Sequence, residues 1–146
     1  MDIEALDIVI SVKEEYLTMI LNGDKTIELR RKAINVAPGS RVWLYAKSPV
    51  AHISACATVQ RVVMGTPRVV WNRYRSDVGI TRGEFDAYFE GSTTACALLL
   101  GDVRYVVPAL KLSDLRSRLK GFHPPQFFKR LSKGSPELML LRSYVA

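Results

Sequence analysis

Apolar residues follow two different periods in the first part of the chain. Residues 8–12 are short and mostly β-branched, which predicts a strand. Apolar residues then recur at helical spacing in residues 13–22, and Ser11 with Glu14 predicts a capping box at the start of this helix. Gly23 supplies the left-handed residue that commonly closes a helix. The pattern therefore predicts a strand followed directly by an amphipathic helix.

The stretch after this helix changes to a period of two residues. Ile27 and Leu29 fall on one face of the predicted strand. The opposite face carries three polar side chains, Thr26, Glu28 and Arg30. One side of such a strand can be buried while the polar side forms a wall of a cleft. A solvated strand face with ion pairs between strands fits the same spacing.

Alternation returns between residues 41 and 47, after a turn at Pro38-Gly39. Apolar residues occupy the even positions, whereas Arg41, Trp43, Tyr45 and Lys47 occupy the odd ones. This pattern predicts a second strand with a polar face, on which we expect Tyr45 to be exposed. Pro49 ends the strand because proline cannot donate to a sheet ladder, and we expect the following loop to rim the cleft.

The middle of the chain predicts a long buried strand and then two helices. Residues 53–64 are largely apolar and β-branched, which is typical of a strand that crosses a small barrel. Thr66-Pro67 predicts the start of one helix, and a capping box at Thr81 to Glu84 predicts the start of another. Two helices are therefore expected between this strand and the next.

Strands and short helices are also predicted in the last third of the chain. Residues 95–107 predict two consecutive strands joined by a turn at Gly101-Asp102. Ser113-Asp114 predicts the cap of a short helix, and Ser135-Pro136 predicts the start of a final helix. Together the predicted elements form a mixed sheet with helices inserted between its strands and at its end.

Composition limits the class of protein. At 146 residues, 48% of them hydrophobic and 24% charged, the chain suits one soluble domain over residues 1–146. No apolar run approaches the roughly 20 residues that a membrane-spanning helix needs, and the first ten residues carry no basic residue. We therefore expect a cytoplasmic protein without membrane contact. Cys56 and Cys96 lie in separate apolar runs, which predicts buried free thiols, and we expect no metal and no cofactor.

The net charge of +7 is concentrated near the C-terminus. Residues 1–110 hold 13 Lys and Arg against 12 Asp and Glu, whereas residues 111–146 hold 8 against 2. The strongest cluster there is Lys129, Arg130 and Lys133. Such a field attracts phosphate and favours a nucleic-acid partner, although scattered cations also serve solubility alone.

Gly23, Lys25, Glu28 and Arg30 fill the pattern G-x-K-x-x-E-x-R. This pattern resembles the signature of the ASCH domain, a branch of the PUA-like superfamily, and residues 39–49 with Phe122-His123-Pro124-Pro125-Gln126 are similar to the same family. The likeness covers roughly residues 8–131. It implies an α+β fold, a PUA-like mixed β-barrel with helices inserted between strands and at the C-terminus.

The resemblance implies an RNA-binding protein, in some members a metal-independent ribonuclease, whose partner is single-stranded or structured RNA. In this interpretation Lys25, Arg30 and Lys47 hold a phosphate and Tyr45 assists proton transfer. Glu28 either orients its cationic neighbours or serves as a general base. The candidate catalytic residues are Lys25, Glu28, Tyr45 and Lys47, and the candidate RNA-contacting residues are Thr26, Arg30, Lys129, Arg130 and Lys133.

Three alternatives stay open at the level of sequence. One is an amidohydrolase acting on an acylated nucleoside, for which Lys25-Thr26 would supply a lysine and a nucleophile, although the downstream acid is missing between residues 56 and 64. Another is an acid–base pair formed by His52 and His123. The third is a regulatory RNA-binding module without catalysis. Oligomeric state does not follow from the sequence.

Overall fold

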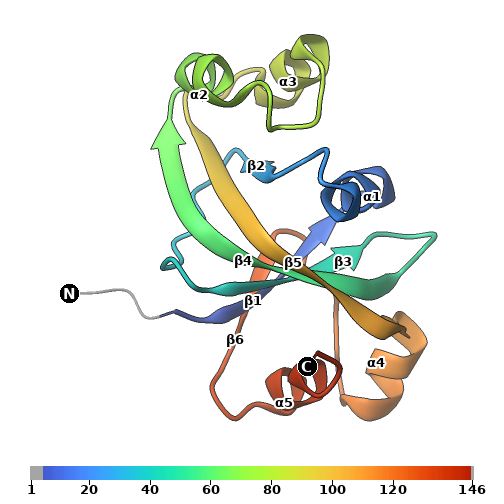
Figure 1. Cartoon of the computed structure of the whole chain (residues 1–146). Helices are drawn as coiled ribbons and strands as arrows, with labels where there is room; N and C mark the ends of the chain where they lie inside the picture. The colour runs from blue at the N-terminus through green and yellow to red at the C-terminus, as the bar shows by residue number, and fades with distance from the viewer. Residues whose placement is uncertain (1–4, 146) are drawn as a thin grey trace.

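A computed structural model of the chain describes residues 5–145. Its centre is a six-stranded sheet in the order β2-β5-β4-β3-β1-β6, in which β1 and β3 run parallel and the other neighbours are antiparallel (Figure 1). The strands are β1 (Asp7–Val12), β2 (Ile27–Arg30), β3 (Arg41–Ala46), β4 (His52–Gly65), β5 (Ala95–Lys111) and β6 (Phe128–Leu131). The helices are α1 (Glu14–Asn22), α2 (Pro67–Tyr74), α3 (Arg82–Phe89), α4 (Leu112–Arg118) and α5 (Pro136–Arg142).

The sheet curls because β4 and β5 are long and bend, with register shifts along their pairing. The α2–α3 insertion sits at one end of these two strands, whereas α4 and α5 lie at the other end (Figure 1). Apolar side chains form one core inside the curl, a second core under α4 and α5, and a third under the α2–α3 insertion. The predicted α+β fold, a curled mixed sheet with inserted and C-terminal helices, is confirmed.

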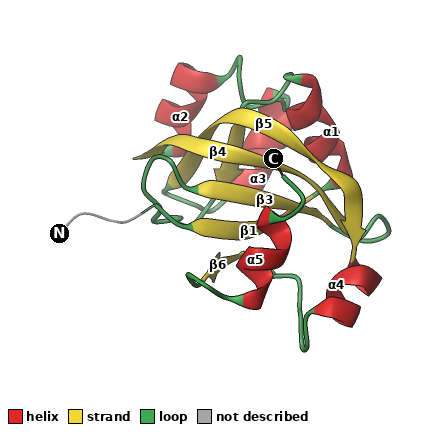
Figure 2. Ribbon diagram, turned by 60° about the horizontal axis from the view of Figure 1, so that its bottom comes forward, coloured by secondary structure: helices red, strands yellow, loops and turns green. Residues whose placement is uncertain are grey.

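Strand β3 is buried on both faces at its centre, so the predicted polar face is wrong for Trp43 and Tyr45, whereas Lys47, just after the strand, is exposed as predicted. Val42 and Leu44 face the inner core, as the alternation predicted. Trp43 and Tyr45 are also buried, at 0% and 3% exposure, because apolar residues of α4 and α5 cover their face. Figure 2 shows α5 lying against this side of the sheet. Sequence alternation could not reveal a cover supplied by α4 and α5, which come much later in the chain.

Strand β5 runs without a break from Ala95 to Lys111, so the predicted turn at Gly101-Asp102 is also wrong. A bulge stands there instead: between Cys56 and Thr58 on β4, the partner strand contains one additional residue. Asp102 adopts a φ of +46°, and a Cβ at position 101 would collide with the Gln60 side chain. The glycine therefore permits a bend within the strand and close approach to Gln60.

Helix ends largely agree with the sequence signals. Gly23 closes α1 with a φ of 84°, and the Thr81–Glu84 capping box begins α3. The predicted capping role of Ser11 is wrong, because Ser11 lies within β1 and Lys13 is the N-cap of α1. The Ser11 hydroxyl donates instead to the carbonyl of Pro125 at 2.6 Å. This bond ties β1 to the segment that precedes β6.

Both cysteines are buried free thiols, as predicted. Burial raises the pKa of the Cys56 and Cys96 thiols, so both stay protonated at neutral pH. Across residues 5–145, no helix has the length and apolar character needed to cross a membrane.

Candidate functional site

Two pockets adjoin near the end of β1. The inner pocket has a volume of about 120 Å³ and the outer pocket about 610 Å³. Ser11 and Lys47 line both pockets, so the two form one groove. The inner pocket is lined by Val12, Lys13, Tyr16, Lys25, Glu28, Leu29, Arg30, Ile80 and Tyr88, and the outer pocket by Tyr45, Ser48, Leu112, Arg116, Pro124, Pro125 and Gln126.

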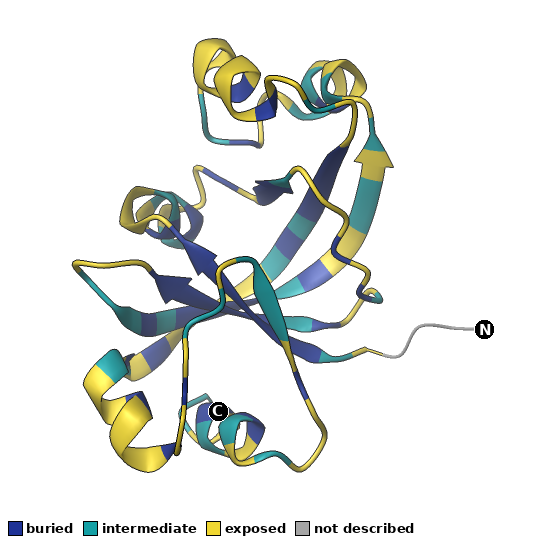
Figure 3. Cartoon of the chain, turned by 180° about the vertical axis from the view of Figure 1, so that it is seen from behind, coloured by how far each residue is buried: buried dark blue, intermediate teal, exposed yellow. Residues whose placement is uncertain are grey.

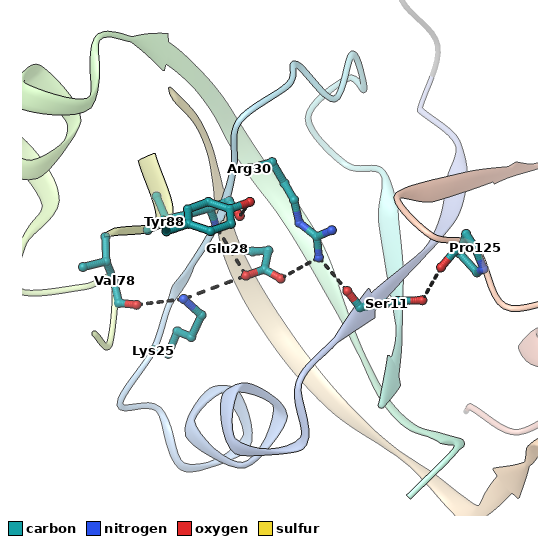
Figure 4. Close-up of polar contacts among 8 residues, drawn as sticks. Ser11, Lys25, Glu28, Arg30, Val78, Tyr88 and Pro125 are labelled. Carbon is teal, nitrogen blue, oxygen red and sulfur yellow. Dashed lines mark hydrogen bonds and ion pairs between the residues drawn. The ribbon is translucent and has the colours of Figure 1, made fainter. Parts of the chain in front are cut away.

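A row of alternating charges crosses the inner pocket (Figure 4). The Lys25 ammonium donates to the backbone carbonyl of Val78 at 2.7 Å and lies 3.9 Å from Glu28 Oε1. Glu28 Oε2 accepts a hydrogen bond from Arg30 Nη2 at 3.0 Å, and the same nitrogen donates to the Ser11 carbonyl at 2.7 Å. The motif residues therefore connect the α2–α3 insertion to β1.

Two-residue periodicity in β2 explains part of this arrangement. Ile27 and Leu29 share a buried face, as predicted, and pack under the insertion, which turns Glu28 and Arg30 toward the inner pocket. Their side chains are 4% and 12% exposed, so the ion pair is largely shielded from water. A shielded carboxylate held by a guanidinium is fixed in position.

Lys25 is the most deeply buried cation of the site, with only 2% of its surface exposed. Burial lowers the pKa of Lys25, whereas the nearby Glu28 carboxylate raises it and so opposes this effect. The ammonium also lies 5.0 Å from the centre of the Tyr16 ring. Its hydrogen bond to Val78 and its burial together make Lys25 a link between segments rather than a freely reaching side chain.

Aromatic and apolar side chains form the remaining wall of the inner pocket. Tyr16 comes from α1, and Ile80 and Tyr88 come from the α2–α3 insertion. The Tyr88 hydroxyl donates to the Leu29 carbonyl at 3.3 Å, which holds α3 against β2. Burial raises the pKa of both tyrosines, so their phenols remain neutral. The insertion is thus part of the site, a role that its sequence did not indicate.

The outer pocket brings a tyrosine and two cations together. Tyr45 packs its ring in the second core and lines the pocket with Lys47 and Arg116. Burial raises the pKa of Tyr45, and the Arg116 charge opposes that rise. Arg116 was not among the residues predicted for the site. The available signal was its spacing from Leu112, because residues four apart share one face of a helix and both line this pocket.

The groove is strongly cationic. Among the described residues that line it, one is a carboxylate, Glu28. Against that single negative charge stand five cationic side chains, Lys13, Lys25, Arg30, Lys47 and Arg116. A concave surface with this balance attracts phosphate groups.

The structure brings Lys25, Glu28, Arg30, Tyr45 and Lys47 to the groove but not the other predicted site residues. Thr26, which precedes β2, is exposed and lies outside both pocket linings. Its backbone amide donates to the Asp77 carbonyl at 3.0 Å. Its position gives no support to Thr26 as a nucleophile in an amidohydrolase site beside Lys25.

The C-terminal basic cluster does not form one patch. Successive residues of β6 face opposite sides, so Lys129 lies over the Phe122 ring while Arg130 donates to the Asn35 carbonyl at 3.0 Å. Lys133 lies beside a separate cavity near α5. Neither these three cations nor the two histidines line the groove.

Comparisons with known proteins give consistent results. The family model described as "Domain of unknown function (DUF365)" matches residues 5–132. A relative from Zymomonas mobilis, named an ASCH domain-containing ribonuclease, is 34% identical over 125 residues, which span 86% of this chain and 84% of that protein.

Solved structures extend the comparison. The crystal structure of ASCH from Zymomonas mobilis has a TM-score of 0.87 at 30% identity and covers 97% of this chain and 96% of that one. A tyrosine-to-phenylalanine variant of the same protein also has a TM-score of 0.87, at 31% identity, covering 94% and 96%. The N-terminal domain of Staphylothermus marinus McrB, with a TM-score of 0.57 and 11% identity over 100% of this chain and 99% of that one, shares the fold alone.

Proposed function

This chain belongs to the ASCH domain proteins of the PUA-like superfamily, within the family described as DUF365, and we propose that it binds RNA in the cationic groove and cleaves it without a metal ion. The observation that carries the proposal is the charge of the groove, where five cations face one buried carboxylate. The name of the Zymomonas mobilis relative, a ribonuclease, supports RNA as the polyanion.

The shape of the groove favours single-stranded RNA. The inner pocket, at about 120 Å³, is close to the roughly 150 Å³ of a cavity that accepts benzene, so it admits one unpaired ring but no base pair. Tyr16 and Tyr88 offer aromatic surface for such a ring. Lys47, which lines both pockets, is then placed to contact a phosphate between two nucleotides.

The outer pocket holds the groups suited to phosphoryl chemistry. We assign Lys47 and Arg116 to the phosphate, whose negative charge grows in the transition state. The 2′-oxygen attacks phosphorus and loses its proton to solvent hydroxide, while the bond from phosphorus to the 5′-oxygen breaks. Tyr45 gives its proton to that leaving oxygen and regains one from water, because its raised pKa keeps the phenol protonated at neutral pH.

The motif residues have a different part in this proposal. The Lys25 ammonium is held by the Val78 carbonyl and the Glu28 carboxylate by Arg30, so neither is free to follow a scissile phosphate. We assign them as positioning residues that fix Arg30 and the wall of the inner pocket. Arg30, at the rim of that pocket, completes the cationic lining.

The test measures binding and cleavage by the whole protein. Fluorescence anisotropy with a labelled single-stranded RNA at low and high salt should show affinity that falls steeply with salt. A gel of the same mixture should show cleavage that persists in EDTA. The double variant Lys47→Gln, Arg116→Gln should lose cleavage, whereas a matched control, Lys32→Gln with Lys120→Gln, removes the same charge outside both pockets.

The results of the binding and cleavage assays distinguish a ribonuclease from a non-catalytic RNA-binding module. Absence of RNA binding by the wild type would overturn the proposal. Salt-dependent binding without cleavage would leave a non-catalytic RNA-binding module. Cleavage that EDTA abolishes would remove the metal-independent mechanism.

A further inference from the structure

The α2–α3 insertion carries a second basic surface outside the groove. Residues 61–75 contain four arginines and no Asp or Glu. All four, Arg61, Arg68, Arg73 and Arg75, are exposed. Asp and Glu elsewhere in residues 1–110 offset these arginines in the net charge of that segment. The net charge of each segment therefore indicates a basic region only near the C-terminus.

Helical spacing gathers three polar residues of α2 on one face. Arg68, Asn72 and the C-cap residue Arg75 are separated by four and three residues, so they follow one another along the helix surface. Val70, on the opposite side of α2, is buried and belongs to the third core. We call Arg68, Asn72 and Arg75 the α2 arginine face. Figure 3 shows exposed outer turns on the helices of the insertion.

The arginines of this surface are not neutralised. Arg82 on α3 is paired with Asp86 at 3.1 Å, and Arg104 with Asp102 at 3.2 Å. By contrast, within residues 5–145 no carboxylate lies within ion-pair distance of Arg68 or Arg75. Their charges are therefore available to a polyanion, and guanidinium groups suit phosphate because they donate in a planar fork.

Packed rings connect α2 to the inner pocket. Trp71 on α2 contacts Phe85 with a centroid separation of 5.0 Å, and Phe85 contacts Phe89 at 4.6 Å. Phe89 contacts Tyr88 at 4.8 Å, and Tyr88 lines the inner pocket. The Val78 carbonyl also holds Lys25. The arginine face is thus fixed relative to the groove through ring packing and a buried hydrogen bond.

We propose that the α2 arginine face binds the phosphate backbone of RNA that extends beyond the groove. The inference rests on the proposed RNA-binding function and adds a second contact surface to it. Backbone contacts of this kind position the nucleic acid and carry no sequence preference. On this proposal, an RNA long enough to extend beyond the groove contacts the arginine face, whereas a short RNA that fills only the groove does not.

The experiment compares RNA length, salt and two matched variants of the full chain. Anisotropy is measured with RNAs of about 4 and about 16 nucleotides, which bracket common single-strand site sizes. Arg68→Gln with Arg75→Gln should weaken binding of the long RNA about tenfold and reduce the slope of log K against log salt by about 1.4. The same variant should bind the short RNA like the wild type.

Lys32→Gln with Lys120→Gln removes two exposed cations elsewhere and serves as the control. Arg68→Gln alone, on the same face, provides a second variant should the double variant lose its circular dichroism spectrum, and it should weaken long RNA in the same direction by a smaller factor. The inference is overturned if the wild type gains no affinity with RNA length, if short and long RNA are weakened equally, or if the control loses as much. Absence of RNA binding at every length overturns the proposed function itself.

Discussion

The Lys25 ammonium and the Val78 carbonyl oxygen are 2.7 Å apart, although 53 residues separate them in the chain. The bond connects the start of the motif strand to the α2–α3 insertion, and the Thr26 amide adds a second bond to Asp77 beside it. Because Val78 leads into Ile80 and Tyr88, this junction sets the position of one wall of the inner pocket.

Replacing Lys25 with methionine tests this junction. Lys25→Met keeps an unbranched side chain that is one atom shorter, leaves the Val78 carbonyl without its donor and leaves Arg30 as the cationic neighbour of Glu28. Breaking a buried charged contact should lower the free energy of unfolding by about 3 kcal/mol, measured by urea denaturation. Thr26→Val, at the exposed neighbouring position, should change it by less than about 0.5 kcal/mol. Equal effects of the two variants would contradict the structural role.

Two glycines of the insertion should respond in opposite directions to the same substitution. Gly79 has a φ of +70°, and a Cβ there would lie 2.8 Å from Lys25 Cβ and 3.0 Å from Met19 Cε. Gly79→Ala should therefore destabilise the protein by about 2 kcal/mol. Gly83 lies in α3 with open space around it, so Gly83→Ala should stabilise by about 0.5 to 1 kcal/mol. Thermal unfolding of both variants measures this difference, and a Gly79→Ala variant at least as stable as the wild type would refute the tight packing at Gly79.

Local sequence rules predicted much of the fold because they depend on nearby residues. The left-handed Gly23, the Thr81 capping box and the alternation of Ile27 and Leu29 each arise within a few positions, and the structure confirms them. The exposure of Tyr45 and the turn at Gly101-Asp102 were predicted wrongly because the surroundings of these residues come from distant segments. Periodicity shows which side chains share a face, but not what covers it.

In the candidate site, too, local patterns located some residues, whereas residues brought in by distant segments were missed. The motif pattern located Lys25, Glu28 and Arg30, and alternation located Tyr45 and Lys47. Arg116 and Tyr88 were missed because their helices reach the groove only after the chain has folded. Conversely, Lys129 and Arg130 are neighbours in sequence but face opposite sides of β6. Clusters of charge along a strand are not clusters in space.

Tyr45→Phe separates proton donation from RNA binding. If the phenol protonates the leaving oxygen, this variant should lower the cleavage rate on the order of 10²-fold while changing RNA affinity less than about twofold. Tyr105→Phe, at a 64% exposed position outside both pockets, serves as the control. Single-turnover cleavage and anisotropy measure the two quantities. An unchanged rate in the Tyr45 variant would remove this residue from the mechanism.

The pH profile gives an independent check of the same role. Burial raises the pKa of Tyr45 above its ordinary value near 10, so the donor stays protonated at neutral and mildly alkaline pH. Cleavage by the wild type should rise with pH while the phenol is protonated and stop rising when it ionises. The residual cleavage by Tyr45→Phe, corrected for hydrolysis without protein, should show no such break. If the cleavage rate of Tyr45→Phe also stops rising at the same pH, the group that ionises there is not Tyr45.

The titration of His52 should lower the free energy of unfolding in mild acid. Burial lowers the pKa of His52, and Lys111 lowers it further, whereas Glu14 raises it. The folded state therefore binds fewer protons than the unfolded state below the ordinary histidine pKa of about 6.5. Stability should fall as pH drops from about 7.5 through that value and level off below the lowered pKa.

Urea denaturation between about pH 7.5 and 5.5 measures this loss, because Asp and Glu side chains with ordinary pKa values remain mostly ionised in that window. His52→Asn removes the titrating group and should flatten the dependence. His123→Asn, at an exposed position, should leave it unchanged. If the wild type keeps the same free energy of unfolding across the window, or if His52→Asn shows the same loss, the partial burial of His52 at the start of β4 does not control acid stability.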